Sequence, residues 1–177
     1  MSLTQYYTAT SLDGFIADPD NSLDWLFTRR QDPDGPLNYR EFIARVGALA
    51  MGSTTYEWIL EHDLADKDPA ESTWPYDIPC WVFTHRQLPV VPTSGVEFTS
   101  ANVATLHKKM VEAADDRNVW IVGGGDLAGQ FADAGLLAGR SRMLDVGGGS
   151  GTYCHAFLAA LPAARATLFD LAEVVAL

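Results

Sequence analysis

Residues 118–137, NVWIVGGGDLAGQFADAGLL, decide the fold that the sequence predicts. An apolar run, VWIV, leads into three glycines, and a stretch typical of a helix follows them directly. This order predicts a buried strand, a glycine turn and a helix. Such a junction can bring backbone N–H groups and a helix N-terminus against a ligand phosphate. A triple glycine after a strand is equally often a tight turn without a ligand, so both interpretations stay open.

The same alternation of strand and helix runs through the chain before this stretch. Short runs rich in β-branched and aromatic residues predict strands, and apolar residues at helical spacing predict helices. Asn102 is the predicted N-cap of the helix before residue 118. The predicted strands cover residues 3–10, 48–52, 79–86 and 95–100, and the predicted helices cover 36–46, 53–60 and 102–116. Repeated alternation with apolar strands predicts an α/β fold with a largely parallel central sheet.

The composition limits the kind of partner. The chain has 177 residues, of which 47% are hydrophobic and 20% charged, as expected for one compact, soluble domain. Its formal net charge of -11 disfavours binding to nucleic acid or to an anionic membrane, because both would repel it. The sequence therefore predicts a small molecule or another protein as partner. An anionic cofactor would need a local cationic pocket built from the 12 Lys and Arg residues.

The cysteines and the chain start indicate neither a metal site nor export. Cys80 and Cys154 are far apart and lack the spacing of metal ligands, so no metal and no disulfide are expected. The first residues lack a basic segment followed by an apolar run, and no stretch approaches the ~20 apolar residues that span a bilayer. The simplest expectation is a cytoplasmic enzyme of bacterial type.

Two further junctions join the glycine turn as candidate binding elements. One is the strand-to-helix junction AMGSTTYEWI, whose hydroxyl residues could bind a ligand or simply cap the helix. The other is the end of the strand in WVFTHR, at the edge where open α/β sheets bind ligands. Solvated surface residues are the alternative there. The candidate residues of these two junctions are Gly52, Ser53, Thr54, Thr55, Thr84, His85 and Arg86.

The order and spacing of these elements resemble the dihydrofolate reductase-like superfamily. The likeness is greatest to the C-terminal reductase domain of the bifunctional deaminase-reductases of riboflavin biosynthesis, and it spans residues 3–137. Four segments carry it, namely SLDGFIA (11–17), MGSTTYE (51–57), VFTHR (82–86) and VWIVGGGDLAGQFADAGL (119–136). The resemblance implies a three-layer sandwich with a mostly parallel mixed sheet, and members of the family commonly form homodimers.

The resemblance also implies a site for NADPH. The pyrophosphate would lie over the glycine turn and the helix start, and Gly52 to Thr55 would contact the other phosphate end. Thr84, His85 and Arg86 would lie beside the adenosine ribose. Many relatives have a basic residue where this chain has Ser53, so the preference for NADPH over NADH depends on Arg86, and NADH stays possible. The implied pyrophosphate residues are Gly123, Gly124, Gly125, Asp126 and Leu127.

Hydride transfer requires that the protein position two carbons and supply or relay a proton. Asp13 is the natural candidate for general acid or for orienting the substrate. A turn aspartate before Gly14 is the alternative. Most large aromatic side chains are expected in the core, whereas Trp25 and Trp74 lie in predicted loops and are the candidate substrate-binding aromatics.

Residues 138–177 depart from the reductase pattern. The stretch MLDVGGGSG, a following helix and ATLFDL resemble the first β-α-β unit of a class I S-adenosylmethionine-dependent O-methyltransferase. Gly147, Gly149 and Gly151 would allow a ligand to approach the backbone, and Asp170 is placed to accept hydrogen bonds from ribose hydroxyls. A tight turn without ligand is the alternative. A methyltransferase needs about 100 further residues, so methyl transfer is not expected.

Three origins of this ending stay open: a recombined fragment, an engineered chimera, or a divergent ending whose strands pair with the reductase sheet. We expect the first or second, with residues 138–177 packed onto the reductase domain and their two strands parallel. The leading function is an NAD(P)H-dependent reductase of a small heterocyclic or carbonyl substrate, pterin-like or riboflavin-precursor-like. The alternatives are a nucleoside-cofactor-binding protein without turnover and an S-adenosylmethionine-binding module.

Overall fold

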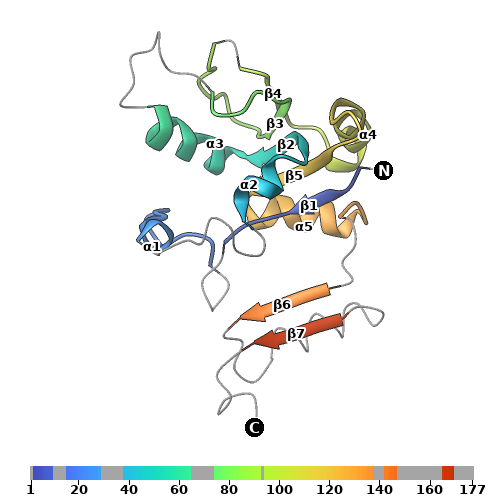
Figure 1. Cartoon of the computed structure of the whole chain (residues 1–177). Helices are drawn as coiled ribbons and strands as arrows, with labels where there is room; N and C mark the ends of the chain where they lie inside the picture. Colours follow the sequence, from blue (N-terminus) through green and yellow to red (C-terminus); the bar gives the residue numbers. More distant parts are fainter. Residues whose placement is uncertain are drawn as a thin grey trace. The chain divides into compact units, whose positions relative to one another are not determined.

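The chain forms two compact units in the computed structural model (Figure 1). One unit comprises Met1–Thr8 and Asp24–Leu137, and the other comprises Ala9–Leu23 and Ala138–Leu177. The structure describes residues 2–9, 15–28, 38–64, 74–92, 94–137, 142–146 and 165–169, the last two ranges as backbone.

The first unit is built on a five-stranded sheet. Its strands are β1 (Thr4–Tyr6), β2 (Val46–Gly52), β3 (Cys80–Phe83), β4 (Val96–Thr99) and β5 (Asn118–Gly123). They lie in the order β1-β5-β2-β3-β4, and each neighbouring pair is parallel. The predicted α/β fold with a largely parallel sheet is therefore confirmed.

Helices cover both faces of this sheet. The helices of the unit are α1 (Asp24–Phe27), α2 (Tyr39–Ile43), α3 (Ser53–Ile59), α4 (Val103–Ala113) and α5 (Gly125–Asp133), and α3 continues as a π-helical turn η1 (Leu60–Leu64). Residues of α2 and α3 pack in one core, and residues of α4 and α5 in the other. Strand β2 shows how the layers form, because its successive residues face opposite sides. Leu49 and Met51 pack in a core with α3, whereas Ala48 and Ala50 pack in a second core with α4 and α5. The result is a three-layer arrangement of helix, sheet and helix.

The small residues of β2 let a helix approach the sheet closely. A Cβ placed on Gly47 would lie 2.0 Å from the carbonyl oxygen of Ala114, the C-cap residue of α4. No side chain fits between two backbones at that distance. At the other end of α4, the side chain of Asn102 accepts a hydrogen bond of 2.8 Å from the backbone N–H of Ala104, so the predicted N-cap is confirmed.

Several predicted boundaries differ from the structure. The strand predicted over 3–10 is β1, which pairs only over Thr4–Tyr6. Within the helix predicted over 36–46, the structure has α2 over Tyr39–Ile43. Val46 starts β2 instead, where it is buried and pairs with Asn118. The helix predicted over 53–60 extends through η1 to Leu64. Trp25, predicted in a loop, lies in α1.

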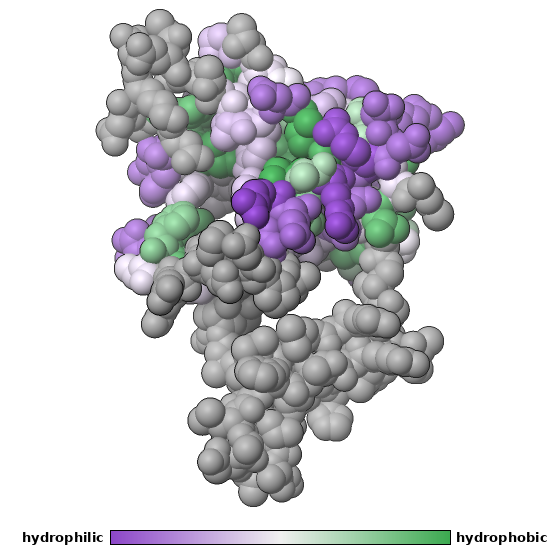
Figure 2. All heavy atoms as spheres, viewed as in Figure 1, coloured by the Kyte–Doolittle hydropathy of each residue, from purple (hydrophilic) through white to green (hydrophobic). Residues whose placement is uncertain are grey.

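One face of the first unit is seen in Figure 2. In the view of Figure 2, hydrophilic side chains cover much of its described surface, and apolar side chains show between them. None of the described helices combines the length and the apolar character that crossing a membrane requires. The described residues hold no cluster of three or more His, Cys, Asp or Glu side chains that could bind a metal ion.

The second unit contains one pair of strands. Strands β6 (Arg142–Val146) and β7 (Arg165–Phe169) pair in parallel, from Arg142 opposite Arg165 to Val146 opposite Phe169. The parallel direction predicted for them is confirmed. They form a two-stranded sheet. That the segment packs onto the reductase domain stays a prediction. Its candidate ligand residues, Gly147, Gly149, Gly151 and Asp170, lie outside the described residues.

Candidate functional site

The three predicted binding elements meet at one edge of the five-stranded sheet. Strand β2 lies between β5 and β3, and all three are parallel, so their carboxyl ends lie at the same edge. The register places Met51 opposite Gly123 and Gly52 opposite Phe83. Three segments far apart in the sequence are thereby neighbours at this edge, namely the glycine turn, the start of α3 and the segment from Thr84 to Arg86. This is the edge at which open α/β sheets bind ligands.

Gly123 is required by a neighbouring side chain. A Cβ at this position would lie 2.6 Å from Oγ1 and 3.2 Å from Cγ2 of Thr55, in the first turn of α3. The glycine lets the end of β5 lie against α3, which brings the two junctions together. Its first role is therefore packing, and the same contact places Thr55 beside the glycine turn.

The next two glycines leave the backbone accessible. Gly124 has a φ of 89° and is the N-cap of α5, and no side chain caps this helix. A Cβ on Gly125 would have no atom within 4 Å apart from its chain neighbours and its own helix backbone. The first N–H groups of a helix have no partner within the helix. The described geometry thus leaves N–H groups and open space at the start of α5, which is what an anionic group requires.

Asp126 and Leu127 can contribute backbone N–H groups to this turn. The side chain of Leu127 is 4% exposed and belongs to the core under α5. The Asp126 carboxylate is exposed and accepts a hydrogen bond of 2.9 Å from the side-chain amide of Gln130. Both residues therefore lie at the start of α5, as the sequence predicts, and the Asp126 carboxylate bonds to a side chain of the same helix.

The start of α3 has a similar form. Gly52 is the N-cap, no side-chain hydrogen bond caps the helix, and a Cβ on Gly52 would have no atom within 4 Å beyond its chain neighbours. The alternative in which the hydroxyls of Ser53, Thr54 and Thr55 cap the helix is therefore wrong. Ser53 and Thr54 follow this accessible glycine directly.

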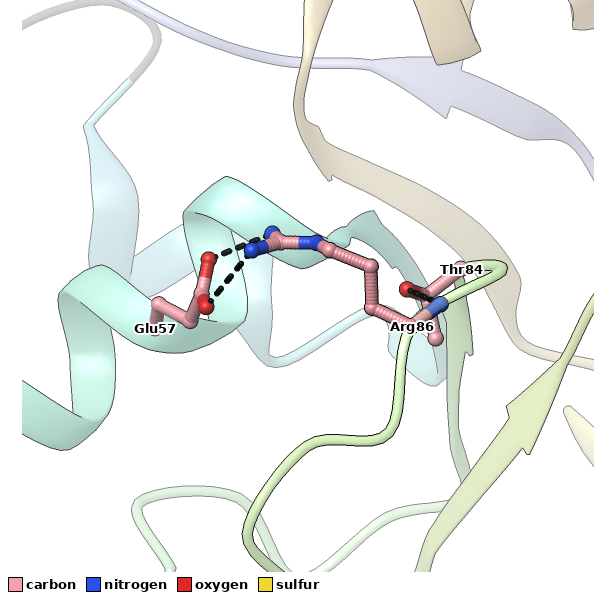
Figure 3. Close-up of polar contacts among 3 residues, drawn as sticks. All are labelled: Glu57, Thr84 and Arg86. Atoms are coloured by element: carbon pink, nitrogen blue, oxygen red, sulfur yellow. Dashed lines mark hydrogen bonds and ion pairs between the residues drawn. The ribbon is translucent and has the colours of Figure 1, made fainter.

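Arg86, on which the expected preference for NADPH depends, is paired with a carboxylate. Its guanidinium donates two hydrogen bonds to the carboxylate of Glu57 on α3, from Nη1 to Oε1 at 3.0 Å and from Nη2 to Oε2 at 2.6 Å (Figure 3). The two side chains are 54% and 41% exposed. The Oγ1 of Thr84 accepts a hydrogen bond of 2.9 Å from the backbone N–H of Arg86. The positive charge of Arg86 is therefore paired and held across the gap between α3 and the segment after β3.

Tyr56 fixes the same segment from the core side. Its buried hydroxyl donates a hydrogen bond of 2.6 Å to the carbonyl oxygen of Pro89. Burial raises the pKa of Tyr56, which keeps the hydroxyl protonated and able to donate. Consecutive residues of α3, Tyr56 and Glu57, thus hold the chain that carries Arg86.

A shallow depression of about 270 Å³ lies beside Arg86. The sequence analysis did not identify Glu57 or the residues from the end of β4 as part of the site. The detectable signals were that Thr99 and Ser100 end a predicted parallel strand, and that Glu57 follows Gly52 by little more than one helical turn. The depression is lined by Thr84, His85, Arg86, Gln87, Phe98, Thr99 and Ser100.

The predicted substrate residues are not brought together in the described part of the chain. Trp74 is 6% exposed and packs in the core against Tyr56, with ring centroids 5.4 Å apart, which corrects its prediction as a pocket residue. The surrounding apolar side chains bury it although it lies in no helix or strand. Trp25 is half-buried on the short helix α1. Asp13 lies outside the described residues.

The fold and this edge define an α/β protein of the dihydrofolate reductase-like class. The structure is similar to the crystal structure of a "Putative riboflavin biosynthesis protein" from Shewanella sp. PV-4. The TM-score is 0.57 and the identity is 26%, over 76% of this chain and 72% of that one. This likeness agrees with the resemblance drawn from the four sequence segments.

Two sequence comparisons give the family. Over 129 residues the chain is 30% identical to "Uncharacterized protein YwjB" of Bacillus subtilis strain 168, covering 72% of this chain and 67% of that protein. The O-methyltransferase domain family matches residues 85–177. The chain therefore belongs to the family of the Bacillus subtilis protein and, through residues 85–177, to the O-methyltransferase domain family.

The methyltransferase match includes residues that belong to the first unit. It begins in the segment after β3 and covers β4, α4, β5 and α5 as well as β6 and β7. Strand pairing places β4 beside β3 and β5 between β1 and β2. By their strand pairing, residues 85–137 therefore belong to the five-stranded sheet of the first unit.

Proposed function

We propose that the first unit is an NAD(P)H-dependent reductase of a small heterocyclic or carbonyl substrate, pterin-like or riboflavin-precursor-like. The observation that carries this proposal is the meeting of the glycine turn, the start of α3 and the Thr84–Arg86 segment at the carboxyl edge of β5, β2 and β3. The similar protein from Shewanella sp. PV-4, named for riboflavin biosynthesis, supports the reductase class.

The residues at this edge fit a dinucleotide. The open Cβ positions at Gly52 and Gly125 leave room for phosphate groups to approach the backbone. The N–H groups at the start of α5 would donate to the pyrophosphate. The hydroxyls of Thr84, Thr99 and Ser100 would face the adenosine ribose from the depression beside Arg86. The dinucleotide is thus held by backbone donors and neutral hydroxyls, and few charges are needed.

When bound, the dinucleotide supplies a hydride for an electrophilic carbon of the substrate. The chain must then deliver a proton to the adjacent heteroatom so that charge and atoms balance. Asp13 remains our proposed proton donor, because a carboxyl partly removed from water can act as general acid near neutral pH. Trp25 remains the proposed aromatic neighbour of the substrate ring.

The proposal is tested by titration with NADPH and NADH, followed by tryptophan fluorescence, with a pair of matched glycine variants. Gly125→Glu adds a carboxylate at the start of α5, whereas Gly129→Glu adds the same group one turn further along, and both Cβ positions are open. We expect saturable binding that falls at least tenfold, roughly 1.4 kcal/mol, in the first variant and is kept in the second. Equal loss in both variants, or no binding by the wild type, would contradict the site.

Turnover is measured separately from binding. Absorbance at the reduced nicotinamide band reports oxidation of the dinucleotide when pterin-like and carbonyl compounds are added. Oxidation that Asp13→Asn slows without loss of binding supports the reductase. Binding without oxidation of any compound supports the alternative, a nucleoside-cofactor-binding protein without turnover.

A second candidate function is an S-adenosylmethionine-binding module in residues 138–177. The O-methyltransferase match and the parallel pairing of β6 with β7 favour it. Isothermal titration with S-adenosylmethionine tests it, with Asp170→Asn as the variant expected to weaken binding through the lost ribose contact. The homodimer also stays a proposal, and light scattering coupled to size-exclusion chromatography measures it directly.

A further inference from the structure

We propose that Glu57 sets the choice of dinucleotide. Its carboxylate pairs with the guanidinium of Arg86, and the site therefore favours NADH over NADPH. This inference rests on the proposed dinucleotide site and adds to it the chemical class of the ribose that is accepted. The two dinucleotides differ only in the 2′-phosphate of the adenosine ribose. Selection between them therefore depends on the charge around that one group.

The pair is bidentate. Both terminal nitrogens of Arg86 donate to separate oxygens of one carboxylate, at 3.0 and 2.6 Å. A fork of this kind holds both groups in place. The partners come from different elements, since Glu57 lies on α3 and Arg86 follows β3. Figure 3 shows both terminal nitrogens of Arg86 bonded to the Glu57 carboxylate. Arg86 also lines the depression.

The charge near the depression is unfavourable for a phosphate. A monoester phosphate carries about -1.5 to -2 charges at neutral pH. Arg86 is the one Lys or Arg side chain among the residues that line the depression, and Glu57 offsets its charge at hydrogen-bonding distance. To bind there, a 2′-phosphate must either separate Arg86 from Glu57 or accept a carboxylate as neighbour.

The same surroundings suit a ribose with free hydroxyls. Thr84, Thr99 and Ser100 offer neutral hydroxyl groups to the depression. Each oxygen of the Glu57 carboxylate has a further lone pair, so it can accept from a 2′-hydroxyl while it keeps Arg86. A carboxylate that accepts from ribose hydroxyls is a general device of dinucleotide sites that use NAD. The unphosphorylated ribose thus needs no rearrangement.

The test compares affinities for NADH and NADPH in Glu57→Gln and in Glu61→Gln. Glu61 is exposed one turn further along the same helical segment, so its variant removes the same charge without touching Arg86. We expect Glu57→Gln to raise the affinity for NADPH relative to that for NADH roughly three- to fivefold, the scale of an exposed ion pair. Glu61→Gln should leave the ratio of the two affinities unchanged.

The double variant Glu57→Gln/Arg86→Gln completes the test. We expect it to lose the gain in NADPH affinity, because no guanidinium is left to receive the 2′-phosphate. If both dinucleotides bind but Glu57→Gln leaves their ratio unchanged, or if Glu61→Gln shifts it equally, this inference is overturned and the proposed site stands. If neither dinucleotide binds to the wild type or to Glu57→Gln, the proposed site fails as well.

Discussion

At the scale of single residues, Gly123 offers a direct test of how the site is assembled. The clash expected at its Cβ involves Oγ1 and Cγ2 of Thr55. Threonine is stiff at χ1, so it cannot move aside without strain. We expect Gly123→Ala to lower the free energy of unfolding by about 1–3 kcal/mol, the usual cost of overpacking. Urea unfolding followed by tryptophan fluorescence measures it.

Two further variants make this result specific. Gly125→Ala meets no atom within 4 Å and should change the stability by less than about 0.5 kcal/mol. Thr55→Ala removes both clashing atoms, and the next nearest atom is the Cβ of residue 55 at 3.5 Å, so Gly123→Ala should cost much less in that background. An equal cost with and without the Thr55 methyl and hydroxyl would show that the contact is not responsible.

The same residues mark how far the sequence predicts the site. The types and order of Gly52, Gly123 and Arg86 were enough to place them at one edge, because parallel strands end together. The partner of Arg86 was not predicted, since pairing with Glu57 depends on how α3 lies beside the segment after β3. The sequence left open whether Gly123 serves a ligand or a tight turn, and it gave no sign that Thr55 requires this glycine. Side-chain contacts between elements are not encoded in local spacing.

At the scale of elements, the hydrogen bond between His107 and Thr4 joins α4 to β1. Oγ1 of the buried Thr4 lies 2.8 Å from Nε2 of His107. Burial lowers the pKa of His107 below its ordinary value of 6.5. The unfolded chain then binds a proton at a higher pH than the folded chain does. The contribution of His107 to stability is therefore complete above pH 6.5 and is lost as the pH falls toward the folded pKa.

We expect the wild type to lose more stability than His107→Gln between pH 7.5 and pH 5. Glutamine keeps a polar group that can bond the Thr4 hydroxyl but does not titrate, so the difference isolates the imidazole. Urea midpoints for both proteins at each pH give the comparison. A parallel loss of stability in the two proteins would remove His107 as the cause, leaving the other titrating groups.

The boundaries of the elements were less predictable than their order. Val46 continues the apolar spacing of the preceding helix, yet pairing with Asn118 places it in β2. After α3 the helix instead runs further than predicted, because η1 continues it to Leu64. In both places the neighbouring elements decide where a strand or helix ends, and local propensity is overridden.

At the scale of the whole molecule, the change of sequence pattern after Leu137 has a structural counterpart. The five strands before it form one hydrogen-bonded sheet, and β6 and β7 pair in another. The sequence indicated this change because MLDVGGGSG has the pattern of a first strand and glycine loop, which the reductase pattern does not place there. It could not indicate the pairing, because two parallel strands could equally extend an existing sheet.

A chain ending at Leu137 should therefore keep the five-stranded sheet. Its five strands pair with one another without β6 and β7, and the described residues of both of its cores lie before residue 138. We expect a cooperative thermal transition within about 5 °C of the full chain, equivalent to roughly 1 kcal/mol or less, and unchanged affinity for the dinucleotides. A chain ending at Gly124 is the control, since it also loses α5 with the buried Leu127 and Phe131, and it should not fold cooperatively. If the chain ending at Leu137 also melts without a transition, residues 138–177 are part of the same cooperative unit, and the proposed dinucleotide site depends on the segment that resembles a methyltransferase.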